Sequence, residues 1–476
     1  MKLIRKLIEF RKQKYGYASG AGWDKILKEN LEFFNKNPYA EIVLSEMSDR
    51  RNTEINVKTF KSIGKIIAYP ILSVINHNKK DKEWKKEKGI IISYLDREND
   101  WGLIWPVAQE LENKKIYYYF FVDKDVYKAH RAQLKSLSYA AVYSTERLGD
   151  KKNVLLTKSD FTDAFKNAKI ISNIISRYSL GSYLEYVSEF ISYKAISNGL
   201  YRRYFQNCRF SYSLGNRIFG FLYQKYGIRH FAMQHGEHNE ASLRVWSALT
   251  KSNVYLAFTY GAVHEALFKK GYGTNAVAVG SMLTRKKVER IKKNKIVYFA
   301  YSAGLTSNML YDKEIKRTLD EFIALYNRNK RNYIFSLKIH PNDSEGYFKE
   351  YNPLFGNEII IEPVGRSATD VLAETDICIS LGSTVSIQAI KMGVIAVQLM
   401  REWDIFPGQP YAHRVKSLNE IDRVILDAEF RDDIIRNQQE MIIEYDENIE
   451  HPEEEVVRII MNDINFNERR MEYNAE

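Results

Sequence analysis

Three features of the sequence predict an α/β fold with two Rossmann-like doubly wound domains. Short apolar runs alternate with helical patterns between residues 89 and 285, and again between 286 and 416. These runs are continuously apolar, which is typical of parallel strands covered by helices on both faces. At 476 residues the chain is also too long for one ordinary core. We expect the two domains to face a cleft, with helical extensions at both ends of the chain.

The expected first domain follows segment 1–88, which we interpret as a helical or mixed extension. Its first strand is predicted over 90–96, followed by a helix over 101–114 and a second strand over 115–125. Further strand-like runs lie at Val154–Thr157, Phe210–Tyr212, His230–Met233, Val254–Phe258 and Ala276–Val279. Residues 144–206 fit the alternation less well and are expected to be mostly helical.

The second domain shows the same alternation over residues 286–416. Strands are predicted at Ile296–Ala300, Tyr333–Ile339, Ile359–Ile361, Ile377–Ser380 and Val394–Val397, and helices at Glu314–Asn327, Ser367–Glu374 and Thr384–Lys391. The last segment, 417–476, is highly charged and expected to be helical. Doubly wound sheets bind ligands outside the carboxyl ends of their strands, so the loops that follow the strands are the candidate sites.

The net charge of +11 indicates an anionic partner: a nucleotide, a phosphate-rich polymer or an anionic membrane surface. No zinc-finger spacing or RNA-recognition motif accompanies the charge, so we expect no nucleic-acid partner. No apolar run approaches the ~20 residues that span a bilayer. With Cys208 and Cys378 lacking metal-ligand spacing, a cytoplasmic protein is expected. The basic amphipathic segment 2–14 predicts peripheral contact with an anionic membrane; packing on the protein itself is the alternative.

Three loops of the second domain carry residues suited to phosphate binding. In "YSAGLTSN" (301–308), Ser302 and Gly304 let backbone N–H groups approach a phosphate, although a plain turn would use the same residues.

In "SLKIHPNDSEG" (336–346), the predicted strand stops at a histidine followed by a proline. His340 can donate to a phosphate oxygen, and Pro341 biases its backbone to an extended form. Lys338 shares a strand face with His340. The alternative is a polar turn with a structural histidine.

A third phosphate candidate is the turn between the strand at Ile377–Ser380 and the next helix. Gly382 permits a tight bend, and Ser383 or Thr384 can cap the helix. The same geometry offers N–H groups and hydroxyls to an anion. Capping alone would also explain these residue types.

The stretch "RHFAMQHGEHNEASLR" (229–244) is the corresponding candidate in the first domain. Gly236 allows a sharp bend after the strand, and His235 or Glu237 could take a proton from an attacking hydroxyl. The three histidines lack the HExxH spacing of zinc enzymes, so no metal is expected. A polar turn with a structural histidine is the alternative.

With these residues in view, the chain resembles a GT-B glycosyltransferase. It is most similar to bacterial capsule and lipopolysaccharide enzymes that transfer sialic acid or Kdo from a CMP-activated donor. The resemblance covers about residues 210–400 and rests on His340-Pro341 and Ser383-Thr384. In that family the histidine and the hydroxyls hold the donor phosphate. Gln388 stands where many members have a ribose-binding glutamate, whereas "YSLGN" (212–216) replaces the acidic motif that carries the catalytic base.

The resemblance implies metal-independent transfer of a sugar from a nucleotide-sugar donor, without a cofactor, to a glycan or glycolipid hydroxyl. "QHGE" (234–237) is also similar to a Gln-His-Gly stretch of Kdo-transferase-like and polyol-phosphate transferase proteins. A CDP-glycerol or CDP-ribitol transferase is therefore one alternative. A UDP-sugar 2-epimerase-like enzyme and a non-catalytic basic membrane- or polymer-binding module are the others.

Overall fold

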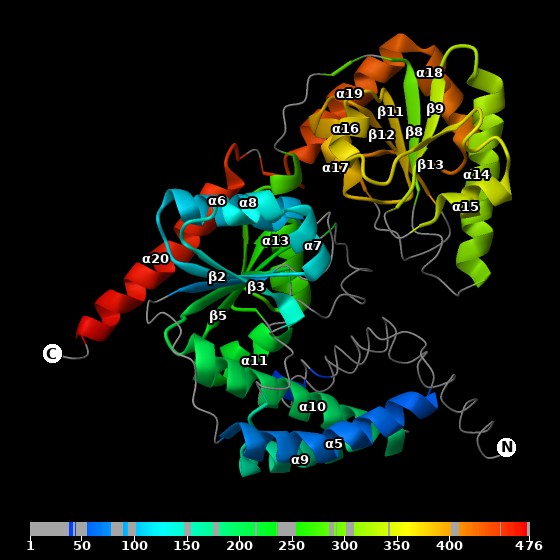
Figure 1. Cartoon of the computed structure of the whole chain (residues 1–476). Coiled ribbons are helices and arrows are strands. Elements are labelled where there is room, and N and C mark those ends of the chain that lie inside the picture. The colour runs from blue at the N-terminus through cyan, green and yellow to red at the C-terminus, as the bar shows by residue number, and fades with distance from the viewer. Residues whose placement is uncertain are drawn as a thin grey trace, which may run out of the picture.

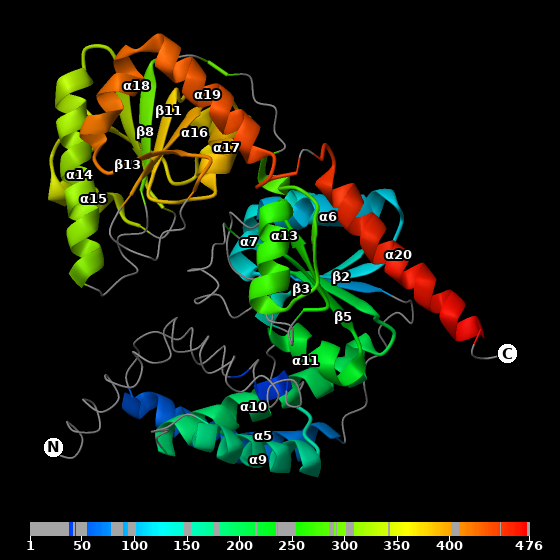
Figure 2. The same cartoon turned by 180° about the vertical axis from the view of Figure 1, so that it is seen from behind.

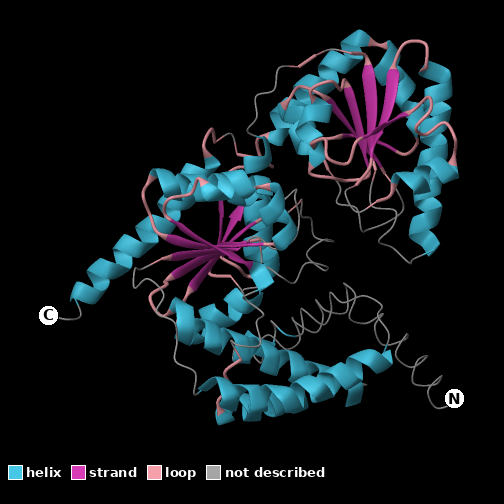
Figure 3. Cartoon of the chain, viewed as in Figure 1, coloured by secondary structure: helices cyan, strands magenta, loops and turns pink. Residues whose placement is uncertain are grey.

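The computed structural model contains two parallel β-sheets, each flanked by helices (Figures 1 and 3). It describes residues 38–40, 43, 55–77, 89–93, 101–146, 154–174, 180–214, 217–234, 236, 254–284, 290–291, 293–300, 309–340, 343–400, 409–447 and 449–473.

The first sheet has seven described strands in the order β3-β2-β1-β4-β5-β6-β7, all parallel. In its register Ile90 lies opposite Tyr118 on one side and Phe210 on the other. The order reverses between β1 and β4, which makes this the topological switch point. The strands are β1 (Ile90–Ser93), β2 (Tyr118–Val122), β3 (Ala140–Ser144), β4 (Phe210–Ser213), β5 (Arg229–Met233), β6 (Leu256–Thr259) and β7 (Ala276–Ala278).

The second sheet repeats this topology with six described strands in the order β10-β9-β8-β11-β12-β13. All five pairings are parallel, and the switch point lies between β8 and β11. Two sheets with Rossmann strand order confirm the predicted fold class. The strands are β8 (Lys295–Phe299), β9 (Ile334–Lys338), β10 (Ile360–Glu362), β11 (Ile377–Ser380), β12 (Ile395–Leu399) and β13 (His413–Val415).

The strand predicted at Val154–Thr157 is wrong, because this apolar segment runs alongside helices and joins no sheet. Helix side chains take the place of a neighbouring strand: Asn198 Nδ2 donates to the Leu155 carbonyl at 3.0 Å, and Asn76 Nδ2 donates to the Val154 carbonyl at 3.1 Å. Two short edge strands, β3 and β13, were not predicted. Each has another strand on one side only, so its residues need not be continuously apolar.

The helices of the first half pack on both faces of the first sheet. Helices α5, α9 and α10 lie side by side as a separate layer (Figures 1 and 2). The described elements are α5 (Ile55–His77), α6 (Trp101–Asn113), α7 (Lys124–Ala129), α8 (Arg131–Lys135), α9 (Lys158–Ile174), α10 (Leu180–Leu200), η4 (Tyr201–Phe205), α11 (Arg217–Tyr226), α13 (Ala262–Leu267), η6 (Phe268–Tyr272) and η7 (Met282–Thr284).

The remaining helices cover the second sheet, except for the last, α20, which returns to the first domain and packs along α6 (Figure 2). Among the residues described, no helix has the length and apolar character needed to cross a membrane. The elements are α14 (Met309–Asn329), α15 (Glu345–Tyr351), α16 (Ala368–Leu372), α17 (Val385–Lys391), η8 (Leu418–Ile421), α18 (Asp422–Leu426), α19 (Ala428–Ile442) and α20 (Pro452–Tyr473).

One continuous apolar core joins the two sheets. It includes Trp101 from α6, Val456 from α20, Val297 from β8 and Val385 from α17, with Met282 of η7 between the two halves. A separate core fills the other face of the second sheet under α14, and another holds α5, α9, α10 and α11 together. The domains therefore share packing at their junction.

The chain crosses back from the second domain to the first at residues 444–447. Glu447 N donates to the Tyr260 carbonyl at 2.8 Å. The buried carboxylate of Asp446 accepts from Ser281 N at 2.8 Å and lies 2.7 Å from Lys391 Nζ on α17. Asp446 therefore links the end of the first domain to a helix of the second.

Replacing Gly261 by alanine is expected to destabilise this crossing. A Cβ atom at Gly261 would lie 2.4 Å from the carbonyl carbon of Tyr445 and 2.6 Å from the Glu444 oxygen, and both belong to backbone that cannot move aside. We expect a loss of about 1–3 kcal/mol in unfolding free energy, measured by urea denaturation. Gly64→Ala is the control, because that Cβ would meet nothing within 4 Å. Equal stability of the two variants would contradict the crossing geometry.

Candidate functional site

The carboxyl edge of the second sheet carries the predicted donor-binding residues. His340 follows β9 and Gly382 follows β11, and β8 lies between these two strands. The two loops are therefore about 10 Å apart at their backbones, given the spacing of neighbouring strands. Both loops therefore lie at the same edge of the second sheet, on either side of the end of β8. The loop after β8, with Ser302 and Gly304, lies outside the described residues.

His340 lies just beyond the end of a strand, as the sequence predicts. Strand β9 ends at Lys338, Ile339 is fully buried, and His340 is half-buried at the edge of the sheet. Its carbonyl accepts a hydrogen bond from Asp343 N at 2.8 Å, which turns the chain away from the strand. Pro341 lies outside the described residues. His340 therefore lies at the rim of the sheet and is not fully buried.

Lys338 is buried, with 7% of its surface exposed, and its ammonium is used within the protein. Nζ donates to the carbonyls of Pro363 at 2.7 Å and Val364 at 3.1 Å, both in the loop after β10. Burial lowers the pKa of Lys338, and the charge of Glu362 partly offsets this effect. The structure thus gives Lys338 a role in positioning the neighbouring loop, and its contact with a donor stays a prediction.

The turn after β11 has the conformation expected of a glycine. Gly382 adopts a φ of 127°, in the region that other residues avoid, and its N–H donates to Ser380 Oγ at 3.4 Å. Ser383 Oγ accepts from Val385 N at 3.3 Å, whereas Thr384, which begins the helix, makes no capping bond with its side chain. Ser383 is therefore the one of the two predicted residues whose hydroxyl accepts a hydrogen bond at the start of the helix.

Gln398 and Gln409, two buried glutamines that the sequence reading missed, hold this turn in place. Gln398 on β12 donates from Nε2 to the Leu381 carbonyl at 3.3 Å and accepts from Gln409 N at 2.8 Å. Gln409 Nε2 donates to the Ser383 carbonyl at 2.9 Å. The turn is thus fixed from behind by side chains that lie far away in the sequence. The one available signal was a glutamine inside the apolar run 394–399.

Gln388 lies one helical turn after Thr384, so the two residues share a face of α17. The Oε1 atom of Gln388 is buried and has no hydrogen-bond partner among the described residues. Buried amide oxygens are normally paired with protein or water. An unpaired acceptor in the first turn of α17 is suited to a hydroxyl of a bound molecule.

In the first domain the candidate bases His235 and Glu237 lie outside the described residues. The residues around them show how the loop is held. Gln234 is fully buried, accepts from Tyr260 N at 2.9 Å through Oε1, and donates to the Gly236 carbonyl at 2.9 Å through Nε2. Gly236 has a φ of 79°, as its predicted role in a sharp bend requires. A buried amide and a glycine therefore flank His235 at the carboxyl edge of the first sheet.

His230 is a structural histidine of the core. Its ring is fully buried between Ser211 Oγ at 3.0 Å from Nδ1 and Ser213 Oγ at 3.3 Å from Nε2. Burial lowers the pKa of His230 to about 3, so the ring is neutral at physiological pH. Because both of its nitrogens are used by serines of β4, His230 is no candidate for the catalytic base.

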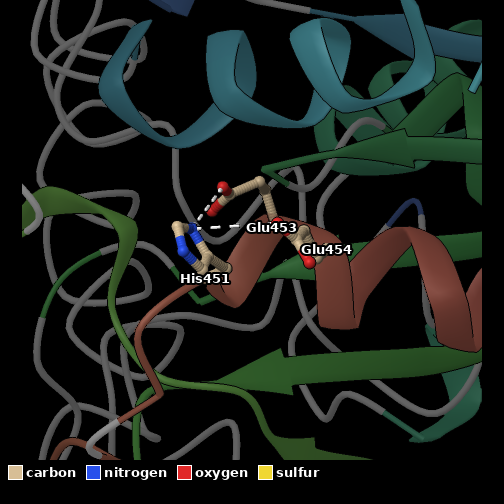
Figure 4. A group of neighbouring side chains, drawn as sticks. All are labelled: His451, Glu453 and Glu454. Carbon is tan, nitrogen blue, oxygen red and sulfur yellow. Dashed lines mark ion pairs between the residues drawn. The ribbon is translucent and has the colours of Figure 1, made fainter. Parts of the chain in front are cut away.

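One cluster of potential metal ligands lies among the described residues, at the start of α20 (Figure 4). His451 Nδ1 is 3.6 Å from Glu453 Oε1 and 3.9 Å from Glu454 Oε1. Lys114 and Arg458 line the same surface hollow, and their positive charges oppose a cation there. The carboxylates occupy the first turn of the helix, where negative charge is favourable without a metal.

Comparisons with known proteins show a distant structural likeness. No protein-family profile and no curated protein matches the sequence. S. aureus MnaA with UDP is 10% identical, with a TM-score of 0.49, over 79% of this chain and 97% of that chain. The wall teichoic acid polymerase TagF soaked with CDPG is 10% identical, with a TM-score of 0.48, over 87% and 100%. Anabaena HepE with UDP and glucose is 10% identical, with a TM-score of 0.46, over 79% and 100%. At this level the likeness concerns the arrangement of the sheets and carries nothing about substrates.

Proposed function

We propose that the chain is a GT-B glycosyltransferase that moves a sugar from a nucleotide-activated donor to a hydroxyl of a surface glycan or glycolipid. The observation that carries the proposal is the carboxyl edge of the second sheet, where the rim histidine His340 and the Gly382–Thr384 turn flank the switch point. A phosphate over β8 would receive an imidazole from one side and N–H groups and hydroxyls from the other. This is the arrangement that a departing nucleotide phosphate requires.

The proposed reaction is displacement at the anomeric carbon of the donor. A base held at the carboxyl edge of the first sheet, His235 or Glu237, takes the proton from the acceptor hydroxyl. The bond from the anomeric carbon to the phosphate oxygen breaks, and the nucleotide leaves with the electron pair. His340 and the turn before α17 stabilise the charge that develops on this phosphate. Gln388 binds a ribose hydroxyl through its unpaired Oε1.

The donor that we propose is a CMP-activated nonulosonate or Kdo, because of the His-Pro and Ser-Thr pairs that the sequence shares with enzymes of that kind. Protein groups supply the positive charge, so no metal is needed for the leaving group. The proposal also places the protein in the cytoplasm, where nucleotide sugars are available.

Nucleotide binding tests this proposal directly. We expect CMP to raise the melting temperature more than CDP or UDP does. A ligand at 100 times its Kd stabilises the folded state by about 2.7 kcal/mol, which a thermal shift assay resolves. Thr384→Val should weaken CMP binding about tenfold or more, since it removes a hydroxyl facing a charged group. Thr162→Val, at an exposed position on α9, is the control and should bind CMP like the wild type.

Other outcomes of the same assay would replace the donor assignment or the function. Stabilisation by CDP alone would indicate a polyol-phosphate transferase, and stabilisation by UDP alone would indicate a UDP-sugar enzyme. If no nucleotide binds and the protein instead binds polyanions tightly, it is a non-catalytic binding module.

A further inference from the structure

Helix α17 begins at the turn proposed to bind the donor phosphate, and it is bonded at both of its ends. Just before its start, Gln409 Nε2 donates to the Ser383 carbonyl at 2.9 Å. At its last residue, Lys391 Nζ lies 2.7 Å from the buried carboxylate of Asp446. Asp446 belongs to the crossing segment 444–447, which returns the chain to the first domain (Figure 2). The end of α17 is therefore attached to this crossing.

The start of α17 is connected to the same crossing through two tyrosines. Gln409 and Tyr411 lie in one turn, which the bond from Ala412 N to the Gln409 carbonyl closes at 3.0 Å. Tyr411 is 1% exposed, and its ring meets the Tyr445 ring at 64°, with 4.9 Å between the ring centroids. An edge-to-face pair of this kind stabilises the contact beyond the buried area alone. Both ends of α17 thus lead to adjacent residues of the crossing.

On its other side the crossing contacts the first domain. Glu447 N donates to the Tyr260 carbonyl at 2.8 Å. His264 of α13 is fully buried, with its Nδ1 3.2 Å from the Tyr445 carbonyl and its ring centroid 5.9 Å from that of Tyr445. Tyr445 therefore contacts Tyr411 of the second domain and His264 of the first.

Tyr260 continues these contacts to the loop of the candidate base. Its backbone N–H donates to Gln234 Oε1 at 2.9 Å, and Gln234 Nε2 donates to the Gly236 carbonyl at 2.9 Å. Gln234 and Gly236 are the chain neighbours of His235. Direct contacts through the crossing segment thus join the residues that flank the candidate base to the turn that precedes α17.

We propose that Tyr445 is a positioning residue for sugar transfer: through Tyr411 and His264 it sets the distance between the donor turn and the loop of the base. The inference rests on the proposed function, because it assigns the two loops to one reaction. Attack on the anomeric carbon requires the acceptor oxygen and the departing phosphate to be correctly placed, and a misplacement of about 1 Å can slow a reaction ~100-fold. Loss of the Tyr445 ring should therefore lower the rate of transfer more than it lowers nucleotide affinity.

This split between rate and affinity distinguishes positioning from a purely structural role. Removing a tyrosine that only stabilises the fold would lower both quantities together, because less of the protein would be folded. The donor turn keeps its bonds from Gln398 and Gln409 when Tyr445 is replaced, so the second domain should still bind nucleotide.

Replacing Tyr445 by leucine in the full chain tests the proposal. We expect kcat to fall ~10–100-fold and the Kd of the nucleotide to stay within ~2-fold. The nucleotide is the one that binds the wild type most tightly, which we expect to be CMP, and kcat is measured with the sugar donor that carries it. Tyr445→Phe keeps the ring and should retain most of the rate. Tyr333→Leu is the matched control: it replaces another half-buried tyrosine, directly before β9, and should leave kcat unchanged.

Gln409→Met tests the same contacts from the second domain, and it serves on its own if the leucine variant does not fold. It removes the bond to the Ser383 carbonyl, so we expect the nucleotide Kd to rise ~10-fold and kcat to fall as well. Gln438→Met is the matched control. Gln438 is 3% exposed and also bonds backbone, accepting from Ala396 N at 3.2 Å and donating to the Ala396 carbonyl at 2.6 Å. This control should bind nucleotide and transfer sugar like the wild type.

Three results would overturn the proposal and leave the proposed function standing. Tyr445→Leu could retain the wild-type kcat. It could lose nucleotide affinity and kcat to the same extent. Gln409→Met could match Gln438→Met in both quantities. A wild type that binds none of CMP, CDP and UDP would instead overturn the proposed function, and this inference with it.

Discussion

Replacing His340 by alanine is expected to slow sugar transfer at least ~100-fold, the loss seen when one donor to a developing negative charge is removed. His340 follows β9 at the rim of the second sheet, across β8 from the turn that begins α17. Its contribution grows as the bond to the phosphate breaks, so kcat should fall more than nucleotide affinity does. The measurement is release of CMP from a CMP-activated nonulosonate or Kdo in the presence of acceptor, with the Kd of CMP determined separately.

The control for this variant is His451→Ala, which removes an exposed histidine at the start of α20 and should leave the rate unchanged. His340→Asn keeps a side-chain donor and should recover part of the activity. Because His340 is only half-buried, its replacement should leave the unfolding free energy within about 1 kcal/mol. An alanine variant that retains a third or more of the wild-type rate would remove His340 from the site.

The sequence predicts a strand well where both faces of the strand are buried, because such a strand consists almost entirely of apolar residues. Ile377–Ser380 is an example: it is a central strand and fully buried, and the prediction matches β11. Two predictions were wrong in opposite ways: a strand that exists, Ala140–Ser144, was not predicted, and a strand that does not exist was predicted at Val154–Thr157. The first is a half-buried edge strand, whereas the second is apolar but has its backbone bonded by asparagine and serine side chains of α5 and α10. Local sequence does not distinguish these cases, because the deciding partners are distant in the chain: the β2 partner of Ala140 is Tyr118, and the helix side chains that bond segment 154–157 are more than 40 residues from it.

Part of the candidate site likewise follows from local sequence, and part depends on residues far away in the chain. The position of His340 after a strand, and the bend at Gly382, follow from local patterns. The glutamines that hold the loops, Gln234 and Gln398, act through contacts with residues from other strands and turns. Helix α5 is a sharper case, because isoleucines spaced four apart favour an inward face. The structure instead turns Ile67 and Ile71 outward and buries Ser73 and Asn76, which bond the adjacent segment 154–157. Ile66 and Tyr69 pack beside them on the apolar core.

Replacing Asp160 by alanine is expected to cost about 3–5 kcal/mol of stability, the usual loss when one member of a buried ion pair is removed. Asp160 is 2% exposed and serves two helices besides its own. Its carboxylate accepts from Thr157 Oγ1 at 2.7 Å, from Asn198 Nδ2 at 2.8 Å and from Lys225 Nζ at 3.1 Å. Lys194 Nζ lies 3.8 Å away. Burial alone would raise the pKa of Asp160, but the Thr157 bond and the Lys225 charge outweigh it and lower the pKa.

The same variant leaves Lys194 buried at 5% exposure without its anion. Burial already lowers the pKa of Lys194 from 10.5 to about 8, with the charge of Asp160 opposing the shift. The folded state therefore loses this proton more readily than the unfolded state does. It follows that Lys194 makes stability rise with pH between about 8 and 10.5, because the unfolded chain then binds the extra proton. Without Asp160 the pKa should fall further and the rise should begin at lower pH.

Urea unfolding at several pH values measures both effects. Asp163→Ala is the matched control: it removes an exposed aspartate from the same helix and should change stability by no more than about 0.5 kcal/mol. Lys194→Met should remove the rise in stability that Lys194 contributes above pH 8. Buried tyrosines such as Tyr39, whose pKa is raised to about 12, lower the stability of both proteins from about pH 10 and stay in the variant. If Asp160→Ala lowers the unfolding free energy no more than Asp163→Ala does, the buried carboxylate makes no net contribution to stability. The layer of α9, α10 and α11 would then be held by its apolar core alone.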